Sequence, residues 1–139
     1  MIALDELRDA AAKAFPRDVL MPPRDAGWQQ IAELGWLLIE LGEADGGIGL
    51  GPEASSAILF EQGRVLSNAP LIPALLGLHA IAASPALPDR AGWIERICGG
   101  DYVPLNMLPA RVLETAQGAL SGTLGGVFEA DMARHVVAG

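Results

Sequence analysis

The sequence predicts a mainly α-helical protein, a five-helix N-terminal bundle followed by the first strands of an incomplete β-domain. Across the first hundred residues, apolar side chains recur at helical spacing between proline and glycine breaks. These breaks are short, and short connections favour antiparallel packing of neighbouring helices. After Gly100 the pattern changes to short apolar runs of strand character. We therefore predict two regions, a helical domain at residues 1–100 and a partial β-domain at 101–139.

Each predicted helix has a recognisable start or end. Pro16 closes the first helix, and Asp25 is a suitable N-cap for the second. Pro52 stands in the first turn of the third helix, and Gly99 ends the fifth. The fourth helix, between them, is almost entirely apolar. The predicted helices cover residues 4–15, 25–41, 52–66, 70–83 and 88–98.

The strand candidates of the second region are short. Valine, leucine, tyrosine and phenylalanine give these stretches their strand character, and glycines and acidic residues separate them. A sheet of a few short strands cannot cover both its faces by itself. We therefore expect this sheet to be incomplete. The candidates lie at residues 102–108, 119–123, 127–128 and 135–138.

Composition and charge narrow the range of partners. Apolar residues make up 51% of the chain and charged residues 19%, which excludes intrinsic disorder and leaves more apolar surface than a lone bundle needs. We therefore expect a homo- or hetero-oligomer. Seventeen acidic against nine basic side chains give a net charge of −8, which argues against nucleic acid as a partner.

The sequence predicts a cytoplasmic protein with no membrane partner. Asp5 and Glu6 stand where a secretory signal would carry basic residues. The longest apolar stretch, residues 69–83, is interrupted by prolines and is shorter than the about 20 residues that cross a bilayer. Cys98 is the only cysteine, so no internal disulfide can form, and its apolar neighbours favour a buried structural thiol.

Residues 47–51 have the glycine spacing of a phosphate cradle. The surroundings argue against that function, because no strand is predicted before the segment and no lysine follows it. Glu43, Asp45 and Glu53 would also repel a phosphate. We interpret the segment as a structural loop.

The pattern assigns no catalytic residue and no metal ligand. The carboxylates form no obvious acid–base pair, and neither His79 nor His135 has a cysteine or acid at ligand spacing. His79 lies on the most apolar helix, where it is either partly buried and hydrogen-bonded or lines a pocket. Asn106, beside Met107 in a predicted strand, faces either a ligand or a turn.

A series of segments occurs in an order and at a spacing that match one enzyme family. The segments are WQQIAELGWLLIEL (28–41), EADGGIGL (43–50), FEQGR (60–64), WIERICGGD (93–101) and LSGT (120–123). An Ala-Asp pair and a Val-Val-Ala run follow them, at residues 130–131 and 136–138. Together they resemble the N-terminal half of an acyl-CoA dehydrogenase, over about residues 25–138.

The resemblance implies a cofactor, a substrate and a reaction. In acyl-CoA dehydrogenases FAD lies against the β-domain, and the acyl thioester lies between the flavin and the helices. A carboxylate base from a C-terminal helical domain removes the α-proton, and the β-hydrogen leaves as hydride to the flavin. This sequence has no match to that C-terminal domain, so the resemblance supplies no catalytic residue.

The resemblance also implies site residues. In the family, a strand that ends in a Thr-Glu-Pro-like turn contacts the flavin. This sequence does not match that turn, and the expected FAD contacts are the positions nearest to it. These positions are Asn106, Met107 and Leu108. The expected acyl-facing residues lie on the apolar fourth helix. They are Leu71, Leu75, Leu78 and His79.

We therefore expect the N-terminal part of an FAD-dependent acyl-CoA dehydrogenase-like oxidoreductase, which acts on an acyl-CoA thioester and supplies part of the acyl pocket. A complementary dehydrogenase chain would provide the rest within an oligomer. Three alternatives remain open: a noncatalytic partner subunit of a heteromeric dehydrogenase, an inactive fragment, and a helical interaction module.

Overall fold

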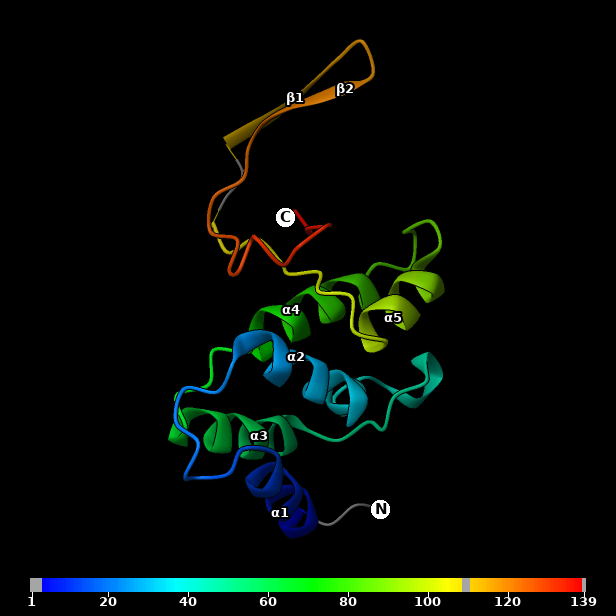
Figure 1. The fold of residues 1–139 in the computed structure, drawn as a ribbon. Coiled ribbons are helices and arrows are strands. Elements are labelled where there is room, and N and C mark those ends of the chain that lie inside the picture. The colour runs from blue at the N-terminus through cyan, green and yellow to red at the C-terminus, as the bar shows by residue number, and fades with distance from the viewer. Residues whose placement is uncertain (1–3, 109–110, 139) are drawn as a thin grey trace.

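Helices come first and strands last along the chain, in the predicted order (Figure 1). The computed structural model describes residues 4–108 and 111–138, without the side chains of 111–114. The helices are α1 (Leu4–Ala14), α2 (Arg24–Glu33), α3 (Pro52–Arg64), α4 (Leu71–Ala82) and α5 (Arg90–Cys98), with 3-10 turns η1 (Trp36–Leu38) and η2 (Glu43–Asp45). The strands are β1 (Arg111–Ala116) and β2 (Ala119–Thr123). The mainly helical fold class is confirmed.

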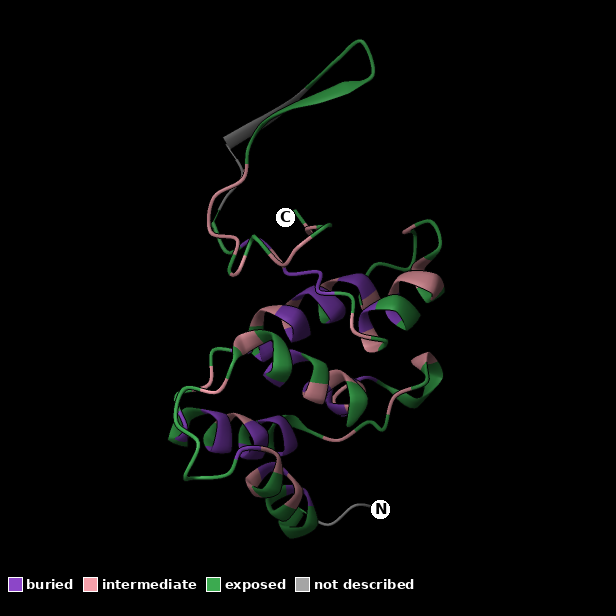
Figure 2. Ribbon diagram, viewed as in Figure 1, coloured by how far each residue is buried: buried purple, intermediate pink, exposed green. Residues whose placement is uncertain are grey.

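The helices form layers, with α1 packed on α3 near the N-terminus and α4 packed on α5 (Figure 1). In this view α2 lies between α3 and α4, and the β-hairpin extends from the opposite end to α1. Buried residues line the inward faces of the helices, whereas the hairpin is exposed along β2 (Figure 2). The helical region therefore contains most of the core, and β2 adds little to it.

The second helix is shorter than predicted. It ends at Glu33 rather than continuing to Leu41, because Gly35 adopts a left-handed conformation with φ of 70°. That conformation is strained for residues with a side chain, so glycine fits the break. The 3-10 turn η1 follows and still buries Trp36 and Leu37, which explains why the apolar spacing looks helical beyond the break.

The predicted N-cap of the second helix is wrong. Pro23 is the N-cap residue, and it makes no side-chain capping hydrogen bond. Asp25 lies one residue inside the helix, where its carboxylate accepts a hydrogen bond from Arg24 Nε at 3.0 Å. A carboxylate in the first turn is favourable beside the positive end of the helix dipole, which explains its position without a cap.

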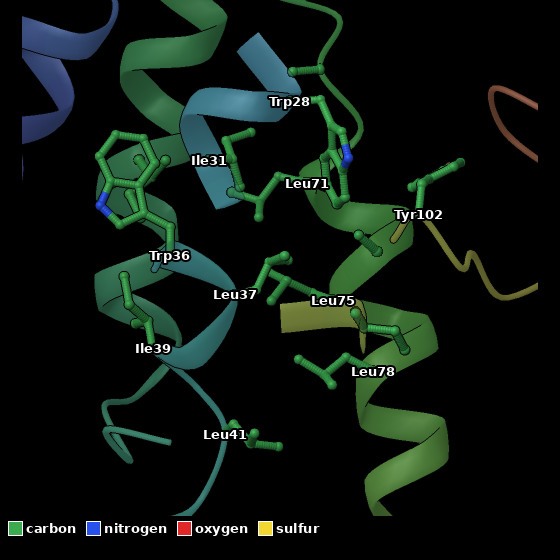
Figure 3. Packing of buried hydrophobic residues seen from close by; sticks show 14 of the residues in the cluster. Trp28, Ile31, Trp36, Leu37, Ile39, Leu41, Leu71, Leu75, Leu78 and Tyr102 are labelled. Atoms are coloured by element: carbon green, nitrogen blue, oxygen red, sulfur yellow. The ribbon is translucent and has the colours of Figure 1, made fainter. Parts of the chain in front are cut away.

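The main core joins α2, η1 and α4 (Figure 3). Ile31, Leu37 and Leu78 are essentially inaccessible to solvent. The extended chain after α5 also packs on this core through Tyr102 and Val103. The core thus fixes the position of the segment that leads toward the strands.

Gly77 allows this segment to approach α4 closely. A Cβ atom built at Gly77 would lie 2.0 Å from the backbone oxygen of Val103, far inside van der Waals contact. The backbone of the segment therefore crosses α4 at a position where no side chain larger than hydrogen fits. The crossing therefore fixes where the segment after Gly100 lies on α4.

The glycine-rich loop is built for packing. A Cβ atom at Gly47 would lie 1.9 Å from the Leu41 backbone oxygen. The backbone amides of Ile48, Gly49 and Leu50 donate hydrogen bonds to carbonyl oxygens of residues 38, 41 and 39. Because amides that would bind a phosphate are used inside the chain, the structural interpretation of this loop is supported.

The strand predictions had mixed outcomes. Strand β2 is confirmed at 119–123, where it pairs antiparallel with β1, which was not predicted. Residues 102–108 and 135–138 meet only at one parallel bridge, Leu105 to Val137, and 127–128 form no strand. These stretches lack the neighbouring strands that would extend their pairing. The division at residue 100 stays a prediction.

The loop at η2 is tied to the start of α5 by an ion pair. Arg90 donates two hydrogen bonds to the Asp45 carboxylate, at 2.7 and 2.8 Å, and a further pair to the Ala82 backbone oxygen. The bidentate hydrogen bonds from the Arg90 guanidinium lower the pKa of Asp45 below its ordinary value of 3.8. The pair links three elements that are distant in sequence.

This pair predicts an acid-dependent loss of stability. Since the pKa of Asp45 is lowered in the folded chain, its contribution is complete above pH 3.8 and is lost as pH falls through the lowered pKa. In urea titrations, the free energy of unfolding should therefore fall less between neutral and acidic pH for Asp45→Asn than for the wild type. Asp18→Asn makes the same charge change at an exposed residue, and its free energy of unfolding should fall as much as that of the wild type. Equal declines for both variants would contradict the prediction.

Candidate functional site

An apolar groove of about 450 Å³ lies where α4, α5 and the C-terminal residues meet, and we call it the α4–α5 groove. It is formed by the C-terminal end of α4, the first turns of α5, the segment after Gly100 and the last described residues. Its lining residues are Ala80, Ile81, Ser84, Leu87, Trp93, Val103, His135, Val136, Val137 and Ala138.

Trp93 joins the helical and C-terminal walls of this groove. Its ring meets the His135 ring edge-on, with the centroids 5.0 Å apart. The Arg96 guanidinium lies over the same indole, 4.4 Å from its centroid. The half-buried indole is therefore held from two sides while it lines the groove, and its position is well defined.

The C-terminal wall is anchored to α2 by charged contacts. Arg24 donates hydrogen bonds to both carboxylate oxygens of Asp131, at 3.0 and 2.8 Å, and another to Glu129. The hydrogen bonds that Arg24 donates lower the pKa of Asp131, and donating them to Asp131 and Glu129 raises the pKa of Arg24. These contacts hold residues 129–131 against α2, and backbone hydrogen bonds of Val137 with Pro104 and Asn106 hold residues 135–138 beside the segment after Gly100.

Two aromatic residues complete the anchor. Trp28 Nε1 donates to the Gly100 backbone oxygen at 2.8 Å, and the Tyr102 hydroxyl donates to the Phe128 backbone oxygen at 2.7 Å. The two rings meet edge-to-face at 5.4 Å. Burial raises the pKa of Tyr102 to about 12, so its hydroxyl stays protonated and can donate at neutral pH.

The lining of the groove is almost entirely apolar. Among its described lining residues, only His135 carries an ionisable side chain, and it is exposed. The Ser84 hydroxyl is already a donor to the Ala80 backbone oxygen at 2.7 Å. A concave site with this lining suits an apolar group of moderate size.

The predicted acyl-facing leucines lie elsewhere on the same helix. Leu71, Leu75 and Leu78 are 1%, 6% and 1% exposed, and they pack toward α2 and η1 (Figure 3). They do not line the α4–α5 groove. A role in an acyl pocket stays a prediction for them.

His79, the fourth predicted residue, lies on the surface of α4. Its side chain is 45% exposed, and its Nε2 lies 3.0 Å from Glu40 Oε2. It is therefore hydrogen-bonded as one interpretation expected, although it is more exposed than that interpretation implied. It does not line the α4–α5 groove, and its role in binding an acyl group also stays a prediction.

The segment Asn106–Leu108 does not by itself fit an FAD site. The backbone amides of Asn106 and Met107 donate to Val137 O and Gly126 O, each at 2.9 Å. The Asn106 side chain is buried and donates to Leu108 O, while Met107 and Leu108 expose apolar side chains. The backbone amides of Asn106 and Met107 and the side-chain amide of Asn106, which could donate to a flavin ring, thus donate within the chain. Contact of these residues with FAD in an assembled enzyme stays a prediction.

Over residues 4–108 and 111–138, no group of three or more histidine, cysteine or acidic side chains is placed to hold a metal. Burial raises the pKa of the half-buried Cys98, which keeps it a thiol, in line with a structural role. In the same part of the chain, no helix has the length and apolar character needed to span a membrane. The cytoplasmic location stays a prediction.

The groove residues were not singled out from the sequence. Trp93 lies on a predicted helix, where core or interface packing is the default, and residues 135–138 look like an ordinary strand. Their proximity is seen in the ring contact of Trp93 with His135 and in the backbone hydrogen bonds of Val137 with residues 104 and 106. No spacing rule in the sequence links these positions.

Comparison with known proteins gives two matches. The model of the family described as "Acyl-CoA dehydrogenase, N-terminal domain" matches residues 2–101. A solved structure, a variant of the "Tcur3481-Tcur3483 steroid ACAD", is similar with a TM-score of 0.60 and 27% identity. The similarity covers 76% of this chain but 32% of that one, and no curated protein matches. The fold and the match over residues 2–101 place this chain in the acyl-CoA dehydrogenase family.

Proposed function

We propose that this chain is the N-terminal, substrate-side part of an FAD-dependent acyl-CoA dehydrogenase-like oxidoreductase, and that the α4–α5 groove receives an apolar part of the acyl group. Family membership supports the activity. The observation that carries the site is the apolar lining of the groove, which adjoins the segment leading into the β-hairpin.

In this proposal the groove provides binding energy and position. Burying apolar surface contributes about 25 cal/mol per Å², so an acyl group enclosed by Ile81, Leu87 and Trp93 would gain several kcal/mol. Exclusion of water would also strengthen polar interactions at the reacting end of the thioester. The described lining residues of the groove include no acid–base pair, so the group that removes the proton would come from another part of the enzyme.

Two features support a heteromeric enzyme. Residues 106–108 do not by themselves fit the flavin, which calls for further contacts from a complementary chain. The structural neighbour is named as a pair, Tcur3481 and Tcur3483, and as a steroid ACAD. We therefore favour a subunit that works with a second dehydrogenase chain, and we include polycyclic acyl groups among its candidate substrates.

Binding in the α4–α5 groove is testable by tryptophan fluorescence. Trp28 and Trp36 are 7% and 4% exposed, so Trp93 is the indole that a ligand would perturb most. Titration with acyl-CoA thioesters, from short chains to steroid acids, should give a saturable change in emission. Ser84→Phe fills the groove and should weaken binding at least about tenfold, equivalent to ~1.4 kcal/mol.

Ala83→Phe is the matched control, because Ala83 is exposed and does not line the groove. It should bind like the wild type. Equal binding by both phenylalanine variants would exclude the groove as the acyl site. A chain that binds no acyl-CoA and gains no flavin absorbance with a complementary dehydrogenase chain would favour the inactive fragment or the interaction module.

A further inference from the structure

The α4–α5 groove contains two side-chain N–H donors, the indole Nε1 of Trp93 and the imidazole of His135. An imidazole carries at least one N–H in either of its protonation states. In the part of the chain that the structure describes, neither ring makes a hydrogen bond, and both interact only through ring contacts. We call these two residues the Trp93–His135 pair. Both donors are therefore available to a ligand in the groove.

The rest of the described lining supplies no other side-chain donor. Ser84 is its third polar residue, and its hydroxyl already donates to the Ala80 backbone oxygen at 2.7 Å. The remaining lining residues are alanine, isoleucine, leucine and valine, whose side chains carry no N–H or O–H. A ligand in the groove therefore meets side-chain donors only at the Trp93–His135 pair.

The two rings support each other's position. They meet edge-on, with an angle of 74° between their planes and their centroids 5.0 Å apart. The Arg96 guanidinium lies 4.4 Å from the centroid of the indole. The backbone amide of Val137 donates to Pro104 O at 2.9 Å, which holds the segment that carries His135. Donors that are already held in place lose little conformational entropy when a ligand binds.

His135 lies at the boundary between the groove and a polar cleft. This cleft has a volume of about 540 Å³, and its lining includes Arg24, Asp131 and Arg134 as well as His135. An apolar ligand that fills the groove would therefore reach polar surroundings at His135. An oxygen atom on that part of the ligand would lie there without being buried among hydrocarbon side chains, which would be costly.

We infer that the Trp93–His135 pair recognises a carbonyl oxygen on the acyl group, so the preferred ligand of the groove is an apolar acyl group that carries a ketone. This inference rests on the proposed function, since it takes the groove as the acyl site. Two N–H donors match the two lone pairs of a carbonyl oxygen. A hydrocarbon in the same place would separate both donors from water and leave them unpaired, which weakens its binding. The pair therefore determines specificity.

The test uses isothermal titration calorimetry of the full 139-residue chain, because calorimetry does not depend on the emission of Trp93. The ligands are CoA thioesters of one bicyclic acyl group, either as the hydrocarbon or with a ketone at successive ring positions. The wild type should bind at least one ketone about fivefold or more tighter than the hydrocarbon, as expected for an added hydrogen bond. The double variant His135→Phe/Trp93→Phe keeps two aromatic rings but neither donor, so this preference should disappear.

Arg134→Gln is the control, since residue 134 adjoins His135 in the chain but lines the polar cleft and not the groove. It should keep the ketone preference of the wild type. Circular dichroism establishes that each variant is folded. The single variants His135→Phe and Trp93→Phe should each lose part of the preference, and they provide the test if the double variant does not fold.

The possible failures are distinguishable. If the wild type binds the ketones and the hydrocarbon equally, the inference is overturned while the proposed function stands. The same holds if the phenylalanine variants keep the full ketone preference. If no thioester binds the wild type, the proposed function fails and the inference fails with it.

Discussion

Gly77→Ala should lower the free energy of unfolding by about 3 kcal/mol, at the upper end of the cost of overpacking. The added Cβ would lie 2.0 Å from the Val103 backbone oxygen. The position of the Cβ is fixed by the helix backbone and the oxygen belongs to the backbone, so neither can rotate away as the end of a flexible side chain would. Helix α4 or the segment after Gly100 must shift, and the α4–α5 groove should lose its shape with it.

Gly63→Ala is the control for this substitution. Gly63 lies in α3, and a Cβ atom there meets no other atom within 4 Å. Alanine should stabilise this helix by roughly 0.4–1 kcal/mol, because it restricts the unfolded chain. Urea unfolding followed by circular dichroism measures both variants. If Gly77→Ala were as stable as Gly63→Ala, the segment could not cross α4 at that glycine.

Leu78→Ala should lower the free energy of unfolding by about 2–5 kcal/mol. Leu78 is 1% exposed and packs in the core with α2 and η1 (Figure 3). Its truncation removes buried methyl groups and leaves a cavity that tightly packed neighbours fill only in part. The same urea titration gives the difference.

Ile72→Ala on the same helix provides the comparison. Ile72 is 53% exposed, so its truncation should cost less than about 1 kcal/mol. The difference between the two losses of stability also tests the prediction that the leucines of α4 face an acyl group. Similar small losses for Leu78→Ala and Ile72→Ala would mean that the leucine face of α4 is open to a ligand, whereas a large contrast means that it serves the core.

The α4–α5 groove, to which the proposed function assigns the acyl group, adjoins the segment leading into the strands. On the hairpin, Leu120 is 65% exposed, so an apolar side chain is also uncovered there.

Helix positions were largely predictable because their signals are local. Pro16 follows α1, Pro52 begins α3 and Gly99 follows α5, and each acts through backbone geometry within a turn of the chain. The break in the second helix was missed, because Trp36 and Leu37 reach the core from a 3-10 turn as well as from a helix. The spacing of apolar residues predicts which side chains are buried, but it does not distinguish an α-helix from a 3-10 turn that buries the same side chains.

The strands were harder to predict because pairing is not local. Strand β1 reads Arg-Val-Leu-Glu-Thr-Ala, without alternation, and it is a strand because β2 pairs with it. Residues 102–108 have stronger strand character, yet they meet one bridging partner, at Val137. A strand depends on its neighbour, whose identity a single stretch of sequence does not contain.

The sequence by itself determined the helical segments, the structural role of the glycine loop and, through its ordered motifs, the family. Only the tertiary structure decided which part of α4 is covered, since Leu71, Leu75 and Leu78 pack in the core while the C-terminal end of the helix, at Ala80 and Ile81, also lines a groove. It also decided that Trp93 meets His135. The physical reason is that hydrophobic spacing specifies a face to be buried, whereas packing between distant elements determines what buries it and where a cavity remains.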